Sequence, residues 1–145
     1  MGGGSSLYLN MRREAVIVSG YFNPLHVGHL ELFEKASSEG AFLIVIVNSD
    51  LQREIKGSKE FMLEDERLKI IQSIKGVGMA LISIDQDSTQ NQTLRLLHDR
   101  FSDTWDLNFA NGGDQTNKTI PESVTCNELG IPLDRDWETD RKSVV

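Results

Sequence analysis

The order of hydrophobic and polar positions along the chain predicts strands that alternate with helices. Ala15–Ser19 is a short β-branched run, and Phe42–Val47 is unbroken apolar, as expected of a parallel strand covered on both faces. Between these runs, apolar side chains recur at helical spacing, at Val27, Leu30, Phe33 and Ala36. Gly40 is a good stop signal for that helix. The three elements therefore form a predicted βαβ unit.

The rest of the chain continues this alternation. A polar segment, Asp50 to Glu60, comes before the next helix. The remaining predicted elements are a helix from about Leu63 to Lys75 with Leu68, Ile71 and Ile74 on one face, a strand Ala80–Ile84, a helix Thr89–His98 with Leu94 and Leu97 inward, a strand Leu107–Ala110, and a helix from Pro121 to about Leu129. This spacing predicts an α/β fold, Rossmann-like and doubly wound, with a mostly parallel sheet and helices on both faces.

One folded domain is expected in a chain of 145 residues. We assign residues 1–13 to a flexible leader, residues 14–133 to the domain and residues 134–145 to an atypical tail that has no strand period. The last residues, DRKSVV, resemble the translation of a common sequencing adapter. The hypothesis is therefore that this tail is an artefact, and it receives no functional weight.

Composition narrows the classes of function. The net charge of −7 disfavours a protein that binds nucleic acid or an anionic membrane non-specifically, because those partners recruit clustered Lys and Arg. The longest apolar run, Ala41–Val47, is far shorter than the roughly 20 residues of a membrane span, and the N-terminus lacks the apolar core of a secretory signal. The single cysteine, Cys126, cannot form an internal disulfide and is expected to be a small core residue on a helix. A cytoplasmic protein is the resulting expectation.

Two histidines, His26 and His29, stand at a predicted loop–helix junction that follows the first strand. In an open parallel sheet, ligands bind at the carboxyl ends of the strands. Free N–H groups and the positive end of the helix dipole attract phosphate there, and imidazole adds directed donors. Gly20 and Gly28 lack side chains and would let a phosphate approach the backbone closely.

Two other interpretations of the histidine pair compete with phosphate binding. The side chains could simply cap the helix. They could also share a zinc ion, but no Cys, Asp or Glu stands near them at ligand spacing. We therefore predict no protein-bound metal at this place.

The stretch GYFNPLHVGH resembles the G-x-F-D-x-x-H-x-G-H signature of the cytidylyltransferase-like nucleotidyltransferases, the HxGH superfamily. The resemblance continues through IVIVNSD, KGSKEFMLEDER and FANGGD, and covers roughly Val16 to Ile131. In pattern the chain looks most like the glycerol-3-phosphate cytidylyltransferases and the heptose-1-phosphate adenylyltransferases. The resemblance implies that residues 14–133 are a nucleotidyltransferase domain.

The resemblance also implies a reaction. A phosphate on a phosphorylated small alcohol or sugar attacks the α-phosphorus of CTP, or less readily ATP, and pyrophosphate leaves. Mg²⁺ is then expected to be held mainly by the substrate phosphates, as this ion prefers. A homodimer is the oligomer that the resemblance suggests. A heptose-1-phosphate type of adenylyltransferase is the alternative assignment.

Catalytic roles are carried over residue by residue. By resemblance, His26 and His29 bind the triphosphate and stabilise the pentavalent transition state. Lys56 or Lys59 would fold over the α- and β-phosphates from a mobile segment after the second strand. The sequence leaves the choice between the two lysines open.

Further positions match the nucleotide-binding elements of the family. Tyr21 and Phe22 would contribute backbone contacts to the nucleotide, and Arg67 would support the phosphate site or a subunit contact. A loop after the fourth predicted strand would lie beside the nucleoside, and it consists of Gly112, Gly113 and Asp114.

The chain departs from the family pattern at three places. Asn23 replaces the usual Asp of the signature, and Gly76–Ala80 replaces a V-D-E-V-like sequence that often supports the dimer interface. The late Ser/Thr-rich element of the I-S-T-S type, which normally contacts the triphosphate, is absent. A catalytically impaired nucleotide-binding module is therefore the rival hypothesis.

Overall fold

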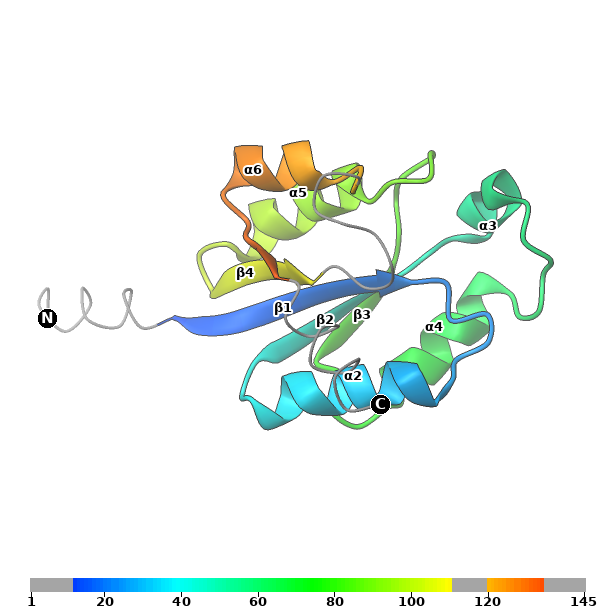
Figure 1. Ribbon diagram of the computed structural model, residues 1–145, viewed down its shortest axis with the longest axis horizontal. Coiled ribbons are helices and arrows are strands. Elements are labelled where there is room, and N and C mark those ends of the chain that lie inside the picture. Colours follow the sequence, from blue (N-terminus) through cyan, green and yellow to red (C-terminus); the bar gives the residue numbers. More distant parts are fainter. Residues whose placement is uncertain (1–11, 111–119, 135–145) are drawn as a thin grey trace, which may run out of the picture.

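The computed structural model describes residues 12–110 and 120–134. Within these ranges the strands form one parallel sheet in the order β3-β2-β1-β4-β5 (Figure 1). The strands are β1 (Arg13–Gly20), β2 (Phe42–Val47), β3 (Met79–Ile82), β4 (Trp105–Ala110) and β5 (Leu133–Asp134). The predicted Rossmann-like, doubly wound α/β fold is confirmed.

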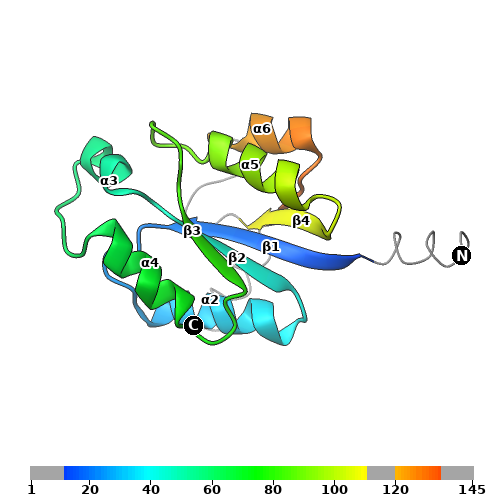
Figure 2. The same cartoon turned by 180° about the vertical axis from the view of Figure 1, so that it is seen from behind.

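Helices cover both faces of the sheet, as both cartoon views show (Figures 1 and 2). On one face lie α2 (Val27–Ser38) and α4 (Glu64–Gln72), and on the other lie α5 (Asn91–Phe101) and α6 (Ser123–Leu129). A short helix, α3 (Asp50–Lys56), lies beyond the carboxyl ends of the strands (Figure 1). The loops that connect strands to helices therefore gather at one edge of the sheet.

The strand sequences explain the two layers of the core. Alternate residues of a strand point to opposite faces, so Val16 and Val45 pack beneath α2 and α4 while Ile17 and Ile44 pack beneath α5 and α6. All four of these side chains are fully buried. Burial on both faces is the reason that β2 is apolar without interruption. The inward orientation predicted for Leu94 and Leu97 is also confirmed.

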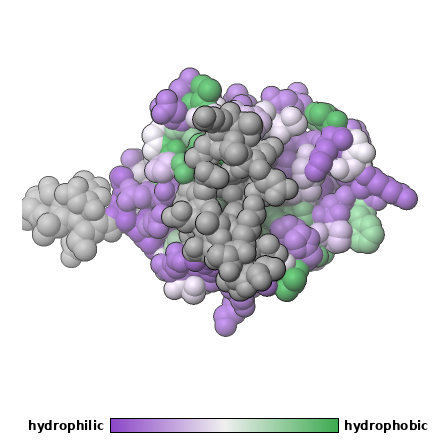
Figure 3. Space-filling view, in the orientation of Figure 1, coloured by the Kyte–Doolittle hydropathy of each residue, from purple (hydrophilic) through white to green (hydrophobic). Residues whose placement is uncertain are grey.

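The surface in Figure 3 is largely hydrophilic where described residues are visible, and its hydrophobic side chains form small separate patches. Within residues 12–110 and 120–134, no helix combines the length and the apolar character that crossing a membrane requires.

The buried face of α2 differs from the predicted one. Phe33 and Ala36 are buried as expected, but Val27 is 66% exposed and Leu30 is 37% exposed. The helix is rotated so that Leu32, one position before Phe33, packs against the core instead. The helical spacing of Val27 and Leu30 therefore does not place them on the buried face, where Leu32, Phe33 and Ala36 pack against the core.

The polar segment after β2 is not a continuous loop, since it contains α3. Ser49 caps this helix by accepting from the Gln52 N–H, and the Gln52 side chain accepts from the Ser49 N–H. This reciprocal pair is a capping box of the S-x-x-Q type. The sequence therefore carried a signal for α3 that its polar composition obscured.

Gly78 has a packing reason in this chain. A Cβ at this position would lie 2.5 Å from the Phe42 ring, so a larger residue could not occupy it without movement. The other side of that ring stacks on Trp105, with centroids 4.2 Å apart. Gly78, in the segment that departs from the family pattern, thus leaves room for the Phe42 ring at the start of β2.

Cys126 lies on α6 and is 1% exposed, which confirms the predicted core position. Burial, with a smaller contribution from the nearby Glu122 carboxylate, raises the pKa of its thiol to about 12. The side chain is therefore a neutral thiol at physiological pH and packs as a small apolar group.

Two buried carboxylates hold the N-terminus of α5. The Asp85 carboxylate accepts from the N–H groups of Gln92 and Thr93, at 2.7 and 2.9 Å. Glu122 accepts from the Gln90 N–H at 2.8 Å. Burial raises the pKa of the Glu122 carboxyl above its ordinary value, against the lowering effect of the Gln90 hydrogen bond, and Asp85 adds to the increase.

The raised pKa of Glu122 predicts a pH-dependent stability. Above the unfolded pKa of about 4.5, the folded protein keeps the proton longer than the unfolded chain, so the free energy of unfolding falls as pH rises through the folded pKa. Glu122→Gln removes this titration and keeps an acceptor for Gln90. Urea denaturation at several pH values from about 4 to 7 should show a smaller decline for the variant than for the wild type. Parallel declines in the two proteins would contradict the prediction.

Candidate active site

The sheet has a topological switch point between β1 and β4. From β1 the chain adds β2 and β3 on one side, and then β4 and β5 on the other side. In open α/β sheets the crevice at this switch point is the usual ligand site. The loop after β1 leads through residues 21–26 into α2. The loop after β4 carries Gly112, Gly113 and Asp114, which lie outside the described residues, so their predicted place beside the nucleoside stays a prediction.

His26 and His29 form a reciprocal cap at the start of α2. His26 is the N-cap residue, and its Nδ1 accepts from the Gly28 N–H at 3.1 Å. The Nδ1 of His29 accepts from the His26 N–H, also at 3.1 Å. The two rings stack with centroids 3.8 Å apart and planes inclined by 29°. The two histidines therefore do cap the helix, and each ring uses its Nδ1 atom to do so.

The cap also determines what the other side of each ring offers. Because Nδ1 accepts a hydrogen bond in both rings, the proton of the neutral imidazole is on Nε2. Each histidine then presents an Nε2–H donor, a group suited to a phosphoryl oxygen. Capping and phosphate binding are therefore compatible, since they use different nitrogen atoms.

The N-terminus of α2 differs electrostatically from those of the other described helices. Within residues 12–110 and 120–134, a carboxylate lies at each of the others, from Asp50 at α3, Glu64 at α4, Asp85 at α5 and Glu122 at α6. The first turn of α2 contains no acidic residue. Its N-cap residue is His26, and the positive end of a helix dipole favours an anion at such a place.

Phe22 fixes the position of the histidine pair. Its buried ring meets the His29 ring edge to face, with centroids 4.8 Å apart. A Cβ on Gly20 would come within 2.9 Å of that ring, so a glycine is required at the end of β1. Phe22 itself has a positive φ of 52°, which turns the chain sharply between the strand and the loop. The predicted close approach of phosphate to Gly20 and Gly28 stays a prediction.

The two candidate lysines lie on either side of a turn after α3. Lys56 is the last residue of α3, and its Nζ lies 4.5 Å from the centre of the Tyr21 ring. Lys59 has an exposed side chain, while its backbone carbonyl accepts from Asn23 Nδ2 at 2.9 Å. Both lysines are therefore brought to the loop that carries the histidines, although they are distant from it in sequence.

Arg67 connects several loops of this edge from inside the protein. Its guanidinium is 0% exposed and forms an ion pair with Asp50, with Nη2 and Oδ1 2.8 Å apart. Nη1 donates to the carbonyls of Tyr21 and Asn48, and Nε donates to the carbonyl of Met62. With these partners the guanidinium has no surface open to a ligand. The predicted support of the phosphate site by Arg67 would therefore be indirect, through the loops that it joins.

Gln52 has a similar role that the sequence did not reveal. Its side chain is fully buried, and Nε2 donates to the carbonyls of Asp87 and Thr89 in the loop after β3. The Tyr21 hydroxyl donates to the Gln52 carbonyl at 3.4 Å. Burial raises the pKa of this hydroxyl, so it remains protonated and able to donate. The loops after β1, β2 and β3 are thus tied together.

The described residues contain no group of three or more His, Cys, Asp or Glu side chains placed to hold a metal ion. A magnesium ion at this site would need phosphate oxygens of a nucleotide as its main ligands, which suits its preference for retained water and substrate oxygen.

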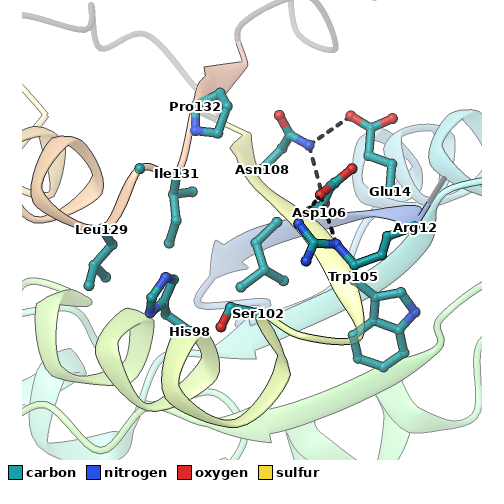
Figure 4. Close-up of a pocket in the computed structure, with 12 residues that line it drawn as sticks. Arg12, Glu14, His98, Ser102, Trp105, Asp106, Asn108, Leu129, Ile131 and Pro132 are labelled. Carbon is teal, nitrogen blue, oxygen red and sulfur yellow. Dashed lines mark hydrogen bonds and ion pairs between the residues drawn. The ribbon is translucent and has the colours of Figure 1, made fainter. Parts of the chain in front are cut away.

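A groove of about 630 Å³ lies at the opposite edge of the sheet (Figure 4). Its walls come from the amino ends of β1 and β4 and the carboxyl ends of α5 and α6. On one wall of the groove, Arg12 forms an ion pair with Asp106 and Asn108 donates a hydrogen bond to Glu14 (Figure 4). Helix carboxyl ends and two carboxylates disfavour a polyphosphate here, so the groove is not the candidate site.

Comparison with known proteins gives the site a context. The profile of the cytidylyltransferase-like family matches residues 17–136. The "Bifunctional protein HldE" of Koribacter versatilis is 41% identical over 69 residues, which are 46% of this chain and 14% of that protein. The protein of the same name from Aliarcobacter butzleri is 28% identical over 124 residues, which are 84% of this chain and 24% of that protein.

A third relative carries a different name. The glycerol-3-phosphate cytidylyltransferase of Staphylococcus aureus is 33% identical over 66 residues, which are 46% of this chain and 50% of that protein. The chain therefore spans half or less of the length of these curated relatives.

A solved structure supports the fold. The crystal structure of the lipopolysaccharide core biosynthesis protein from Thermoplasma volcanium has a TM-score of 0.60 and 24% identity to this chain, and the match covers 83% of this chain and 92% of that one. At this identity the likeness extends to the fold alone.

Proposed function

The chain belongs to the cytidylyltransferase-like family, and on this premise we propose that it is a nucleotidyltransferase. In this proposal it transfers a nucleotidyl group from CTP, or alternatively ATP, to a phosphorylated small alcohol or sugar and releases pyrophosphate. The names of its relatives, which include a glycerol-3-phosphate cytidylyltransferase and the bifunctional HldE proteins, support this class of reaction but leave the base and the acceptor open.

One observation carries the proposal. At the N-terminus of α2, two stacked imidazoles each use Nδ1 for the backbone and keep the proton on Nε2, in a first turn without acidic residues. Directed donors and the positive end of the helix dipole together favour a polyphosphate. Lys56 and Lys59 add positive charge from the segment that contacts Tyr21 and Asn23.

The chemistry asks for no protein nucleophile. An oxygen of the acceptor phosphate forms a bond to the α-phosphorus, and the bond from that phosphorus to the bridging oxygen of pyrophosphate breaks. Negative charge accumulates on the phosphoryl oxygens in the transition state. The Nε2–H groups of His26 and His29 would donate to these oxygens, while Lys56 or Lys59 would neutralise charge on the α- and β-phosphates. Mg²⁺ would supply further charge neutralisation when bound through the substrate phosphates.

The rival is a nucleotide-binding module without turnover, which the absent Ser/Thr-rich element favours. Calorimetry with CTP and with ATP, read beside pyrophosphate release, separates the two. The proposal expects saturable binding of one nucleotide and release of pyrophosphate with Mg²⁺ and an acceptor from a panel of glycerol-3-phosphate, phosphoethanolamine and sugar-1-phosphates. Binding without release favours the module, and absence of binding to a folded chain contradicts both.

The panel also addresses the substrates and the assembly. Preference for CTP with a small alcohol phosphate would assign the cytidylyltransferase type, and preference for ATP with a sugar-1-phosphate the heptose type. A homodimer is part of the proposal by resemblance alone, and light scattering of the same sample tests it.

A further inference from the structure

The segment that carries the two lysines, residues 56–62, is held by side chains rather than by regular secondary structure. Beyond the last residue of α3 it contains no helix or strand. Buried Arg53 donates from Nη1 to the Ser58 carbonyl at 2.9 Å, and Arg67 donates to the Met62 carbonyl. Backbone groups of the segment thus have hydrogen-bond partners, and the mobility expected for it stays a prediction.

Asn23 supplies the link from this lysine segment to the histidine pair. Its Oδ1 accepts from the N–H groups of Phe61 and Met62, both at 3.0 Å, and its Nδ2 donates to the Lys59 carbonyl at 2.9 Å. Asn23 lies in the loop after β1, three residues before His26. One side chain thus joins two parts of the site that are more than 30 residues apart in the sequence.

Tyr21 makes a second, independent link. The Lys56 ammonium lies over its ring at 4.5 Å, within the range of a cation–π interaction. The Tyr21 hydroxyl donates to the carbonyl of Gln52, one turn earlier on α3. The aromatic side chain therefore contacts α3 at two successive turns and keeps the lysine near the end of β1.

We propose that Asn23 and Tyr21 are positioning residues, whose side chains set the lysine segment beside the histidine pair before a nucleotide arrives. This inference rests on the proposed nucleotide site. Lysine side chains lose substantial rotamer freedom when they are ordered on a ligand. A segment that is already docked lowers this cost of ordering at binding. The two side chains act through the lysines and need no contact with the nucleotide.

The residue type at position 23 allows a graded test. Asn23→Asp keeps acceptors for Phe61 and Met62 but has no donor for Lys59, and its carboxylate would face that carbonyl. Asn23→Ala removes all three hydrogen bonds. For the second link, Tyr21→Phe keeps the ring under Lys56, and Tyr21→Leu removes it. Circular dichroism and thermal melting identify any variant that fails to fold. If Asn23→Ala or Tyr21→Leu fails, Asn23→Asp or Tyr21→Phe is compared with the wild type instead.

Limited trypsin digestion measures the docking without any nucleotide. Trypsin cuts after lysine, and cutting requires local opening of the backbone. We expect cleavage after Lys59 to be about tenfold faster in Asn23→Ala than in the wild type, with Asn23→Asp in between. Cleavage after Lys56 should be about two- to fivefold faster in Tyr21→Leu than in Tyr21→Phe. Cleavage after Lys75, an exposed residue beyond α4, is the internal control and should not change.

Calorimetry with CTP and ATP then connects docking with binding. Asn23→Ala should bind the preferred nucleotide about tenfold more weakly, and Asn23→Asp should fall between it and the wild type. Unchanged cleavage after Lys59 in Asn23→Ala would overturn the docking. Faster cleavage with unchanged nucleotide affinity would reduce the link to a purely structural one and overturn the positioning role. If the wild type binds neither nucleotide, the proposed function fails, and the positioning role fails with it while the digestion still reports the docking.

Discussion

Replacing His29 by alanine should lower the rate of pyrophosphate release by about 100- to 1000-fold, the usual effect of removing one donor to a developing phosphoryl charge. The variant loses the Nε2–H that the cap at His26 leaves directed away from the backbone. It also loses the acceptor for the His26 N–H, which should cost about 1 kcal/mol of unfolding free energy, as other helix caps do. Steady-state kinetics and urea denaturation measure the two effects separately.

Two matched variants separate the roles of the imidazole. His29→Asn supplies an oxygen that can cap the His26 N–H but no donor at the Nε2 position, so it should recover stability while activity stays low. His98→Ala removes a histidine of α5 that lines the groove at the opposite edge, and its activity should equal that of the wild type. If His29→Asn restores both stability and turnover, the histidine pair is a cap and nothing more.

Replacing Arg67 by methionine should be the most destabilising single change at the site, by about 3 to 5 kcal/mol. The substitution leaves the Asp50 carboxylate without its buried partner and removes donors from the carbonyls of Tyr21, Asn48 and Met62. Because these groups belong to three separate loops, nucleotide binding should also be lost. Urea denaturation and calorimetry with the preferred nucleotide are the measurements.

Arg95 provides the control for Arg67. It forms an ion pair with Glu128 at the same distance, 2.8 Å, but both side chains are about half exposed. Solvent screening makes such pairs weak, so Arg95→Met should change the unfolding free energy by less than about 1 kcal/mol and leave binding unchanged. Equal effects of the two substitutions would show that burial of the Arg67 pair has no special weight.

The histidine pair illustrates how far the sequence leads. His26 and His29 are close in the chain, so their shared place at a helix start follows from local spacing alone. Which nitrogen serves the helix and which is directed away from it follows only from the geometry of the cap. In the sequence, capping and phosphate binding are competing interpretations of the histidine pair. In the structure, capping uses Nδ1 of each ring and leaves Nε2 for a ligand.

The lysine segment illustrates the opposite case. Its polar composition predicts a loop, although the S-x-x-Q pattern at Ser49 is a signal for the start of α3. In the sequence, Asn23 is only a departure from the family signature. Nothing near it in the chain predicts its hydrogen bonds with the backbone of residues 59–62. Hydrogen bonds between segments more than 30 residues apart depend on the sheet order and leave no periodic pattern.

The alternation of strands and helices, the burial of the central strands and the histidine motif at the first strand–helix junction could all be predicted from the sequence. These features are set by local periodicity and by short-range signals, which a linear chain records directly. The internal position of Arg67 and the links that Gln52 and Asn23 make between loops emerge only in the folded chain. These facts depend on which segments meet at the carboxyl edge of the sheet. The order of the strands in the sheet determines which loops lie next to one another there, and this order cannot be predicted from the spacing of residues in the sequence.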